Sequence, residues 1–221
     1  MKLTIYNGSP RGEHGNTALL IKYFNAGFIA VGDNSSRVYH LAHTYRPEPL
    51  IDSFLQSDVV LLAFPLYTDA MPGLVKAFIE SLESCCGHAG NPAIVFLIQS
   101  GFPESTHLRA LETYLVKLAK RLGCPYLGTI VRGGVEGIRM HSEDKNRDLL
   151  ESFTSLGEYL WRSGRLDPQQ IKELSHLERF PGWVVPMLQI AEKTGLINLG
   201  WDQMMRQNGA YARRFARPYQ D

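Results

Sequence analysis

The chain has 221 residues, of which 44% are hydrophobic and 20% charged, with a formal net charge of +1 at pH 7. These values are typical of one sizeable domain with a buried core, and they give no support to a broad surface for nucleic acid or membrane. No apolar run approaches the roughly 18 residues that span a bilayer, and a signal-peptide layout is absent from the first residues. The chain has an odd number of cysteines, and none of them form a C-x-x-C pair: Cys85, Cys86 and Cys124. This argues against a disulfide framework and against a zinc site. We therefore expect a cytoplasmic protein with no metal and with buried, structural thiols.

Strand-like and helix-like segments alternate through the first three quarters of the chain. The predicted strands are residues 2–7, 37–43, 58–65, 92–99 and 125–131. Helices are predicted after them from apolar stripes: Leu20 with Phe24 and Phe28, residues 49–56, residues 71–82, Leu108 to Leu122, and Leu149 to Leu160. The segments 58–65 and 92–99 are almost wholly apolar, as in strands of a parallel sheet that is covered on both faces. The alternation predicts an α/β fold with a doubly wound, five-stranded parallel sheet, which binds ligands beyond the carboxyl ends of its strands.

The pattern changes from about Arg165. Three helical pieces follow, interrupted by prolines and glycines, and no strand is evident. Their apolar residues are too numerous for a free linker: Phe180, Trp183, Trp201, Tyr211, Phe215 and Tyr219. We therefore divide the chain into a domain of residues 1–164 and a C-terminal helical extension of residues 165–221 that docks on it. The basic end of the extension is either a solvated helix face or a surface for cofactor phosphates or a partner subunit.

The loop "NGSPRGEHGNT" joins the first strand to the first helix. It delivers its backbone into a helix N-terminus, where unpaired N–H groups and the helix dipole favour an anion. Its glycines permit close approach of the backbone to a ligand, and its hydroxyls and Arg11 are suited to phosphate oxygens. Asn16 or Thr17 is the predicted N-cap. The loop therefore predicts a phosphate site, although glycine-rich turns also occur without a ligand.

Several phosphate chemistries do not match this loop. It has no lysine for the P-loop motif, its glycines do not follow G-x-G-x-x-G, and it lacks the cysteine of a phosphotyrosine phosphatase. A nucleophilic Ser9 is a further interpretation, but the G-x-S-x-G pattern fails because Asn7 occupies its first position.

Two separated motifs carry a family resemblance. The loop "GSPRGEHGNT" and, at the third strand, "AFPLYTDAMPGLVKAFIE" resemble the flavodoxin-like NAD(P)H-dependent FMN reductases, which include relatives of the iron–sulfur flavoproteins. The match in layout spans roughly residues 3–160. It implies a flavodoxin-like sheet of order 2-1-3-4-5, FMN as cofactor, NADPH or NADH as co-substrate, and a homodimer. The cysteine cluster of the iron–sulfur members has no counterpart here, so we expect no iron–sulfur cluster.

Carried over by position, the resemblance implies a cofactor site from three loops. Ser9, Arg11, Asn16 and Thr17 are the expected phosphate contacts. The expected wall and hydrogen-bonding edge of the flavin ring are Pro65, Leu66, Tyr67 and Thr68 after the third strand. The loop after the fourth strand adds Ser100, Gly101 and Phe102 as the second flavin-facing segment.

The resulting hypothesis is an FMN-dependent NAD(P)H oxidoreductase. It would pass a hydride from nicotinamide to flavin, and electrons on to a small acceptor such as a quinone, a nitro or azo compound, or free flavin. The chemistry would belong to the flavin, so no catalytic side chain is assigned. A flavodoxin-like electron carrier without its own turnover is the alternative, although such carriers are usually strongly acidic. A hydrolase using Ser9 is a third class.

Overall fold

The computed structural model describes residues 1–44, 46–139, 141–175 and 177–217. Tyr219 and Met140 therefore lie outside the described residues. The strands are β1 (Lys2–Asn7), β2 (Ser35–His40), β3 (Val59–Pro65), β4 (Ala93–Gln99) and β5 (Tyr126–Arg132). The helices are α1 (Asn16–Ile29), α2 (Glu48–Leu55), α3 (Gly73–Ser81), α4 (Arg109–Leu122), α5 (Arg147–Ser163), α6 (Pro168–Leu174), α7 (Val184–Lys193) and α8 (Leu199–Gln207).

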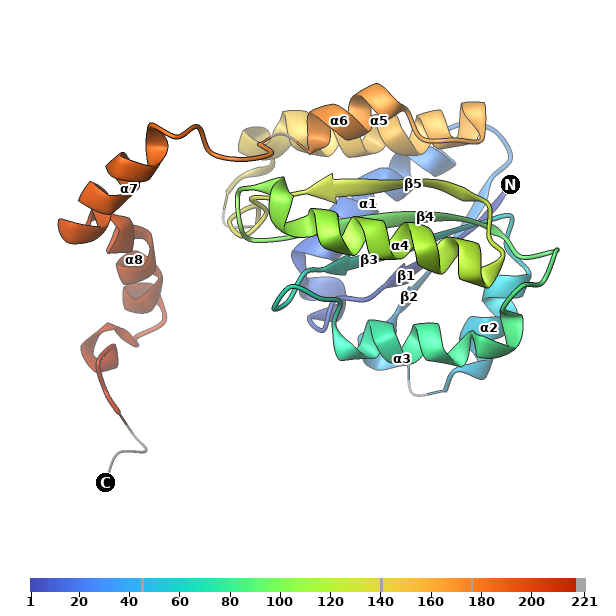
Figure 1. Ribbon diagram of the computed structural model, residues 1–221, viewed down its shortest axis with the longest axis horizontal. Helices are drawn as coiled ribbons and strands as arrows, with labels where there is room; N and C mark the ends of the chain where they lie inside the picture. Colours follow the sequence, from blue (N-terminus) through green and yellow to red (C-terminus); the bar gives the residue numbers. More distant parts are fainter. Residues whose placement is uncertain (45, 140, 176, 218–221) are drawn as a thin grey trace. The chain divides into compact units, whose positions relative to one another are not determined.

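The five strands form one parallel sheet in the order β2-β1-β3-β4-β5, which confirms the predicted flavodoxin-like topology. Figure 1 shows the sheet as one layer between two groups of helices. Helices α1, α5 and α6 cover one face, and α2, α3 and α4 cover the other. All carboxyl ends of the strands therefore meet at one edge, where the loops after β1, β3 and β4 are neighbours.

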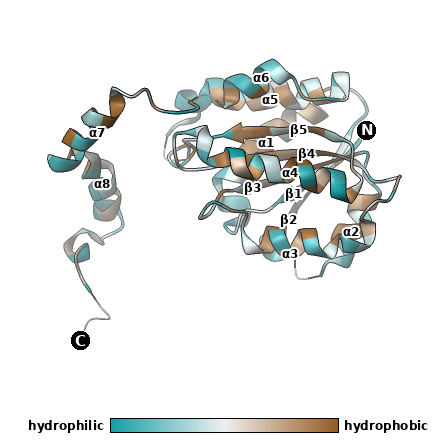
Figure 2. Cartoon of the chain, viewed as in Figure 1, coloured by the Kyte–Doolittle hydropathy of each residue, from teal (hydrophilic) through white to brown (hydrophobic). Residues whose placement is uncertain are grey.

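The sheet separates two hydrophobic cores. Alternate residues of β3 point into different cores, with Leu61 facing α1 and α5 and Leu62 facing the other three helices. Both sides of the strand are thus buried, which explains its uninterrupted apolar sequence. Figure 2 shows the same distribution, with hydrophobic residues along the strands and both kinds of residue on the helices.

Two expectations from the sequence were wrong in detail. The second strand ends at His40 rather than at residue 43, because Leu41–His43 turn into a short 3-10 helix. Cys86 is exposed, whereas Cys85 and Cys124 are buried as expected. Burial raises the pKa of the Cys124 thiol to about 11, so this side chain behaves as a small apolar residue.

Two glycines set the distance between α1 and α5. A Cβ added at Gly157 would lie 1.9 Å from the carbonyl oxygen of Phe24, and one at Gly27 would lie 1.8 Å from that of Thr154. The backbones of the two helices therefore touch, as only glycine at both positions permits. This contact fixes α1, and with it the position of the loop that enters α1.

The chain forms two compact units, Met1–Glu178 and Arg179–Asp221. Helix α6 belongs to the first unit because it packs against α5 and β5. The second unit contains α7 and α8 and no strand among its described residues. That the extension docks on the first domain stays a prediction. Among the described residues, no helix is long and apolar enough to cross a membrane.

Candidate functional site

The loop after β1 is shaped by Asn7, a fully buried residue that sequence reasoning did not include in the site. Its Oδ1 accepts from the backbone N–H of Ser9 at 3.0 Å, and its Nδ2 donates to the carbonyl of Gly12 at 2.9 Å. Gly12 has a φ of +55° and lies so close to His43 that a Cβ there would be 2.5 Å from Nε2. An asparagine at a strand end commonly forms such turns, and this is the signal that could have identified Asn7.

Helix α1 begins at Asn16, and its N-cap is Gly15 rather than the predicted Asn16 or Thr17. Gly15 lies so close to Ser9 that a Cβ at position 15 would be 2.5 Å from Ser9 Oγ. The first-turn N–H groups of Asn16 and Thr17 have no hydrogen-bond acceptor among the described residues, as expected at a helix N-terminus. Arg11 is exposed, and its guanidinium has no partner in the described part of the chain.

The side chains of Asn16 and Thr17 are used within the protein. Asn16 Nδ2 donates to the carbonyl of Val135 at 2.7 Å. Thr17 Oγ1 accepts from Gln99 Nε2 at 3.1 Å and has no exposed surface. In this conformation, Thr17 would meet a phosphate only if the loop moved, so its predicted role stays a prediction.

The loop after β3 is a tight turn with unusual backbone angles. Pro65 and Leu66 are buried, and the Leu66 N–H continues the ladder to the carbonyl of Gln99. Tyr67 and Ala70 then pair with each other across Thr68 and Asp69, whose φ values are +48° and +64°. A β-branched residue such as Thr68 rarely adopts this region, and strain of this kind occurs mostly at functional sites. Tyr67 is 45% exposed.

The loop after β4 presents a second aromatic ring. Ser100 is buried, and its Oγ donates to the carbonyl of Phe102 at 3.1 Å. Phe102 is 59% exposed, with its ring centroid 5.0 Å from that of His107. Gly101 is exposed and lies beside Glu136, whose Oε2 would be 3.2 Å from a Cβ at this position.

Hydrogen bonds tie these loops to one another and to the loop after β5. Gly8 donates to Ala63 and Val135 donates to Ser100, in addition to the bonds of Asn16 and Thr17 described above. Arg139, also in the loop after β5, donates from Nε to the carbonyl of Gly15 and from Nη2 to that of Glu13. The sequence offered no signal for Arg139, since its partners lie more than 120 residues away. The structure thus brings all the predicted site residues to one edge of the sheet.

His40 lies beneath the first loop, where its Nδ1 is 2.9 Å from Asn7 Nδ2. Burial lowers the pKa of His40 below its usual 6.5, and the neighbouring His43 acts in the same direction, while Glu13 opposes both. The folded protein therefore binds a proton here less readily than the unfolded chain does. The resulting stability is fully present above about pH 6.5 and is lost as the pH falls through the lowered pKa.

We expect the urea midpoint of unfolding to be lower at about pH 5 than at about pH 7.5, because protonated Nδ1 cannot accept from Asn7. The difference should shrink in His40→Gln and persist in His88→Gln, which removes an exposed histidine far from the loop. An identical pH dependence in wild type and His40→Gln would contradict this assignment.

No protein-family model and no curated protein matches the chain. Solved structures do match it. An FMN-dependent NADH-azoreductase from Bacillus anthracis, determined with FMN, has a TM-score of 0.58 at 10% identity over 73% of this chain and 100% of its own. An NAD(P)H:quinone oxidoreductase from Methanothermobacter marburgensis has a TM-score of 0.56 at 14% identity over 72% of this chain and 96% of its own. An apo NADH:FMN oxidoreductase has a TM-score of 0.53 at 20% identity over 80% of this chain and 96% of its own.

At these identities the likeness establishes the shared fold alone. It agrees with the sheet order and with the place of the loops at the carboxyl edge. Among the described residues, no three histidine, cysteine, aspartate or glutamate side chains form a group that could hold a metal ion.

Proposed function

We propose that the protein is an FMN-dependent NAD(P)H oxidoreductase that passes electrons to a small acceptor. One observation carries the proposal. The loops after β1, β3 and β4 bring an unpaired arginine, a helix N-terminus and two exposed aromatic rings to one edge of a flavodoxin-like sheet. FMN needs both an anion site for its phosphate and a flat apolar surface for its ring, and the two must be close enough for one molecule to contact both.

The first loop fits a phosphate group. Arg11 supplies a cation whose planar fork matches phosphate oxygens and which no carboxylate of the described residues neutralises. The N-terminus of α1, a helix of 14 residues, adds a positive dipole end and unpaired N–H groups. Gly15 keeps this side of the loop free of a Cβ. Ser9 holds the loop's shape, since its Oγ accepts from the N–H of Arg11 at 3.3 Å.

The second and third loops fit the flavin ring system. Tyr67 and Phe102 expose aromatic surface, which suits the apolar faces of a planar ring. Four backbone N–H groups of these loops have no hydrogen-bond acceptor among the described residues: those of Thr68, Asp69, Gly101 and Phe102. These groups can donate to the polar edge of a ring, as the pyrimidine part of a flavin requires.

Bound FMN would supply a hydride acceptor and an electron donor, which no amino-acid side chain provides. The protein's residues bind and orient: Arg11 and the α1 N-terminus hold the phosphate end, and the loops of Tyr67 and Phe102 hold the ring end. The free N–H donors of those loops would stabilise negative charge on a reduced ring. No acid–base side chain is needed for these roles, so we propose no catalytic side chain.

The names of the similar structures support the substrate class. They include an azoreductase, a quinone oxidoreductase and an FMN oxidoreductase. We accordingly propose quinones, azo compounds, nitro compounds or free flavin as acceptors, and NADH or NADPH as donor. A homodimer in the cytoplasm completes the proposal; the three cysteines are free, which suits a reducing compartment.

The alternatives receive less support. An electron carrier would be expected to dock through a strongly acidic surface, whereas the net charge is +1. A hydrolase would need a base beside Ser9, but this side chain is buried and bonds the loop backbone instead of a histidine of the described chain.

The test is reconstitution. The purified protein should bind FMN with quenching of the flavin fluorescence, and NADH or NADPH should bleach the bound flavin under anaerobic conditions. Readmission of a quinone or azo compound should restore the colour. Failure to bind added FMN would refute the flavin hypothesis, and binding without bleaching by either nucleotide would favour the carrier.

A further inference from the structure

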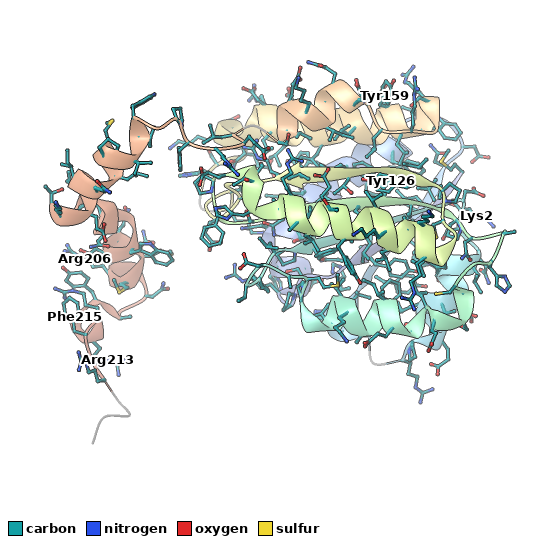
Figure 3. The ribbon with its side chains drawn as sticks, viewed as in Figure 1. Lys2, Tyr126, Tyr159, Arg206, Arg213 and Phe215 are labelled. Carbon is teal, nitrogen blue, oxygen red and sulfur yellow. The ribbon has the colours of Figure 1, made fainter. Side chains whose placement is uncertain are left out.

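The amino edge of the sheet, where the strands begin, carries a polar cavity. Its volume is about 260 Å³, and residues of β1, β2, α2 and the turn after α2 line it. The polar side chains of this lining include those of Lys2, Thr4, Ser35, Arg37, Ser53 and Ser57. Figure 3 shows Lys2 at this end of the sheet, away from the candidate FMN site at the carboxyl ends of the strands. A cavity below the roughly 300 Å³ of common ligand pockets suits a small ion rather than a coenzyme.

The register of the first two strands brings two cations to this cavity. Lys2 pairs with Ser35 and Thr4 pairs with Arg37, so these four residues lie on one face of the sheet. It is the face that α2 covers, because Thr4 Oγ1 lies 3.5 Å from the carbonyl oxygen of Ser53 in that helix. Two positive charges at one cavity favour the entry of an anion.

No carboxylate of the described residues neutralises the two cations. Neither Lys2 nor Arg37 forms an ion pair within the described chain, and the residues that line the cavity include no aspartate or glutamate. Asp58 is nearby, but its Oδ2 accepts from the backbone N–H of Lys2 at 2.7 Å rather than from the ammonium group. The positive charge of both side chains is therefore available to a ligand.

A chain of hydrogen bonds leaves further donors for that ligand. Arg37 Nη1 donates to Tyr39 Oη at 3.2 Å, and Tyr39 Oη lies 2.6 Å from Ser53 Oγ. Tyr39 can therefore donate its own proton to Ser53, which frees the Ser53 proton for an acceptor in the cavity. The hydroxyl of Ser35 has no partner within the described chain and supplies a second such donor.

We propose that the cavity binds a phosphoryl group, either as inorganic phosphate or on a small phosphate ester. The oxygens of this group accept hydrogen bonds from several directions, and one lysine and one arginine match its negative charge. The planar fork of Arg37 suits two of these oxygens, and the hydroxyls of Ser35 and Ser53 supply donors to the others. The cavity lies at the opposite edge of the sheet from the loop after β1, so the inference does not rest on FMN binding.

Titration of the full ¹⁵N-labelled chain with inorganic phosphate, followed by NMR, tests the proposal. The amide resonances of residues 35–37 and 53–57 should shift until they saturate, which separates this cavity from the loop after β1. Lys2→Gln combined with Arg37→Gln should weaken this binding by about tenfold or more, because two charge-assisted contacts are lost.

The matched control is Arg165→Gln combined with Lys172→Gln. Both residues are exposed and lie near β5, at the far edge of the sheet from β2. The control makes the same change in net charge, so it should bind phosphate as wild type does. Shifts confined to the loop after β1, no shifts at all, or wild-type affinity after substitution of Lys2 and Arg37 would overturn the proposal.

A smaller change keeps the test decisive if the double variant misfolds. Tyr39→Phe retains the ring that stacks on Tyr6 and removes only the hydroxyl between Arg37 and Ser53. It should weaken phosphate binding about two- to tenfold. An affinity equal to that of wild type in this variant would also contradict the proposal.

Two further ligands decide which molecule supplies the phosphoryl group. Glycerol 3-phosphate that binds more tightly than inorganic phosphate would identify an ester as the ligand, and weaker binding would identify the free ion; either result supports the site. Glycerol alone is uncharged and should not shift the resonances of residues 35–37 and 53–57. If glycerol bound as well as its phosphate ester, the cavity would be a polyol site and the proposal would be wrong.

Discussion

Replacing Arg11 with alanine should weaken FMN binding by about 10- to 100-fold and leave riboflavin binding unchanged. The two ligands differ by the phosphate, and Arg11 is the unpaired, exposed cation of the loop after β1. A hydrogen bond to a charged group contributes about 1.5–3 kcal/mol, which corresponds to this range. Fluorescence titration with both ligands measures the difference directly.

Arg165→Ala is the matched control. Arg165 is also exposed, but the next residue, Leu166, lies against Gly128 near the start of β5. Arg165 is therefore at the opposite end of the sheet from the loop after β1. Its removal should change neither the affinity for FMN nor that for riboflavin. Equal loss of FMN and riboflavin binding in Arg11→Ala would mean that Arg11 acts on the loop's structure rather than on the phosphate.

Gly157→Ala should lower the free energy of unfolding by about 2 kcal/mol or more. The added methyl would lie 1.9 Å from the Phe24 carbonyl oxygen, which is backbone and cannot rotate away. Helices α1 and α5 would have to separate along their contact, and this cost should exceed the gain of about 1 kcal/mol in helix propensity. Urea unfolding measures this loss. If the m-value is unchanged, the shift of the unfolding midpoint gives the change in the free energy of unfolding.

Gly73→Ala is the corresponding control, because Gly73 is also helical and a Cβ there would meet nothing within 4 Å. Its stability should equal or slightly exceed that of wild type. If Gly157→Ala were as stable as Gly73→Ala, the close approach of α1 and α5 would not exist in solution.

These two sites illustrate what the sequence can and cannot reveal. The apolar runs of β3 and β4 are local signals, and they were sufficient to predict a parallel sheet covered on both faces. The loop after β1 was equally visible, since its glycines, Arg11 and the following helix are contiguous. The contact between Gly27 and Gly157 was not, because each glycine alone is only a weak helix residue.

The same limit applies to the candidate site. That Asn16 and Thr17 contact a phosphate, as the resemblance implies, stays a prediction, but the sequence did not show that their side chains bond Val135 and Gln99, which lie far along the chain. Such partners become visible only when the topology is known. The end of β2 was misplaced for a related reason: Leu41–His43 alternate like a strand, yet the segment turns beneath the first loop beside Gly12.

The hydrogen bonds between the loops also determine how the candidate site can adapt to ligands of different shape. Backbone and side-chain hydrogen bonds fix the ends of β1, β3, β4 and β5 to one another, whereas the rings of Tyr67 and Phe102 are largely exposed. The site would therefore adapt to planar ligands of different shape by rotation of these two side chains, which takes picoseconds to nanoseconds. The exchange of one bound planar ligand for another would then not be limited by the slower opening of a lid.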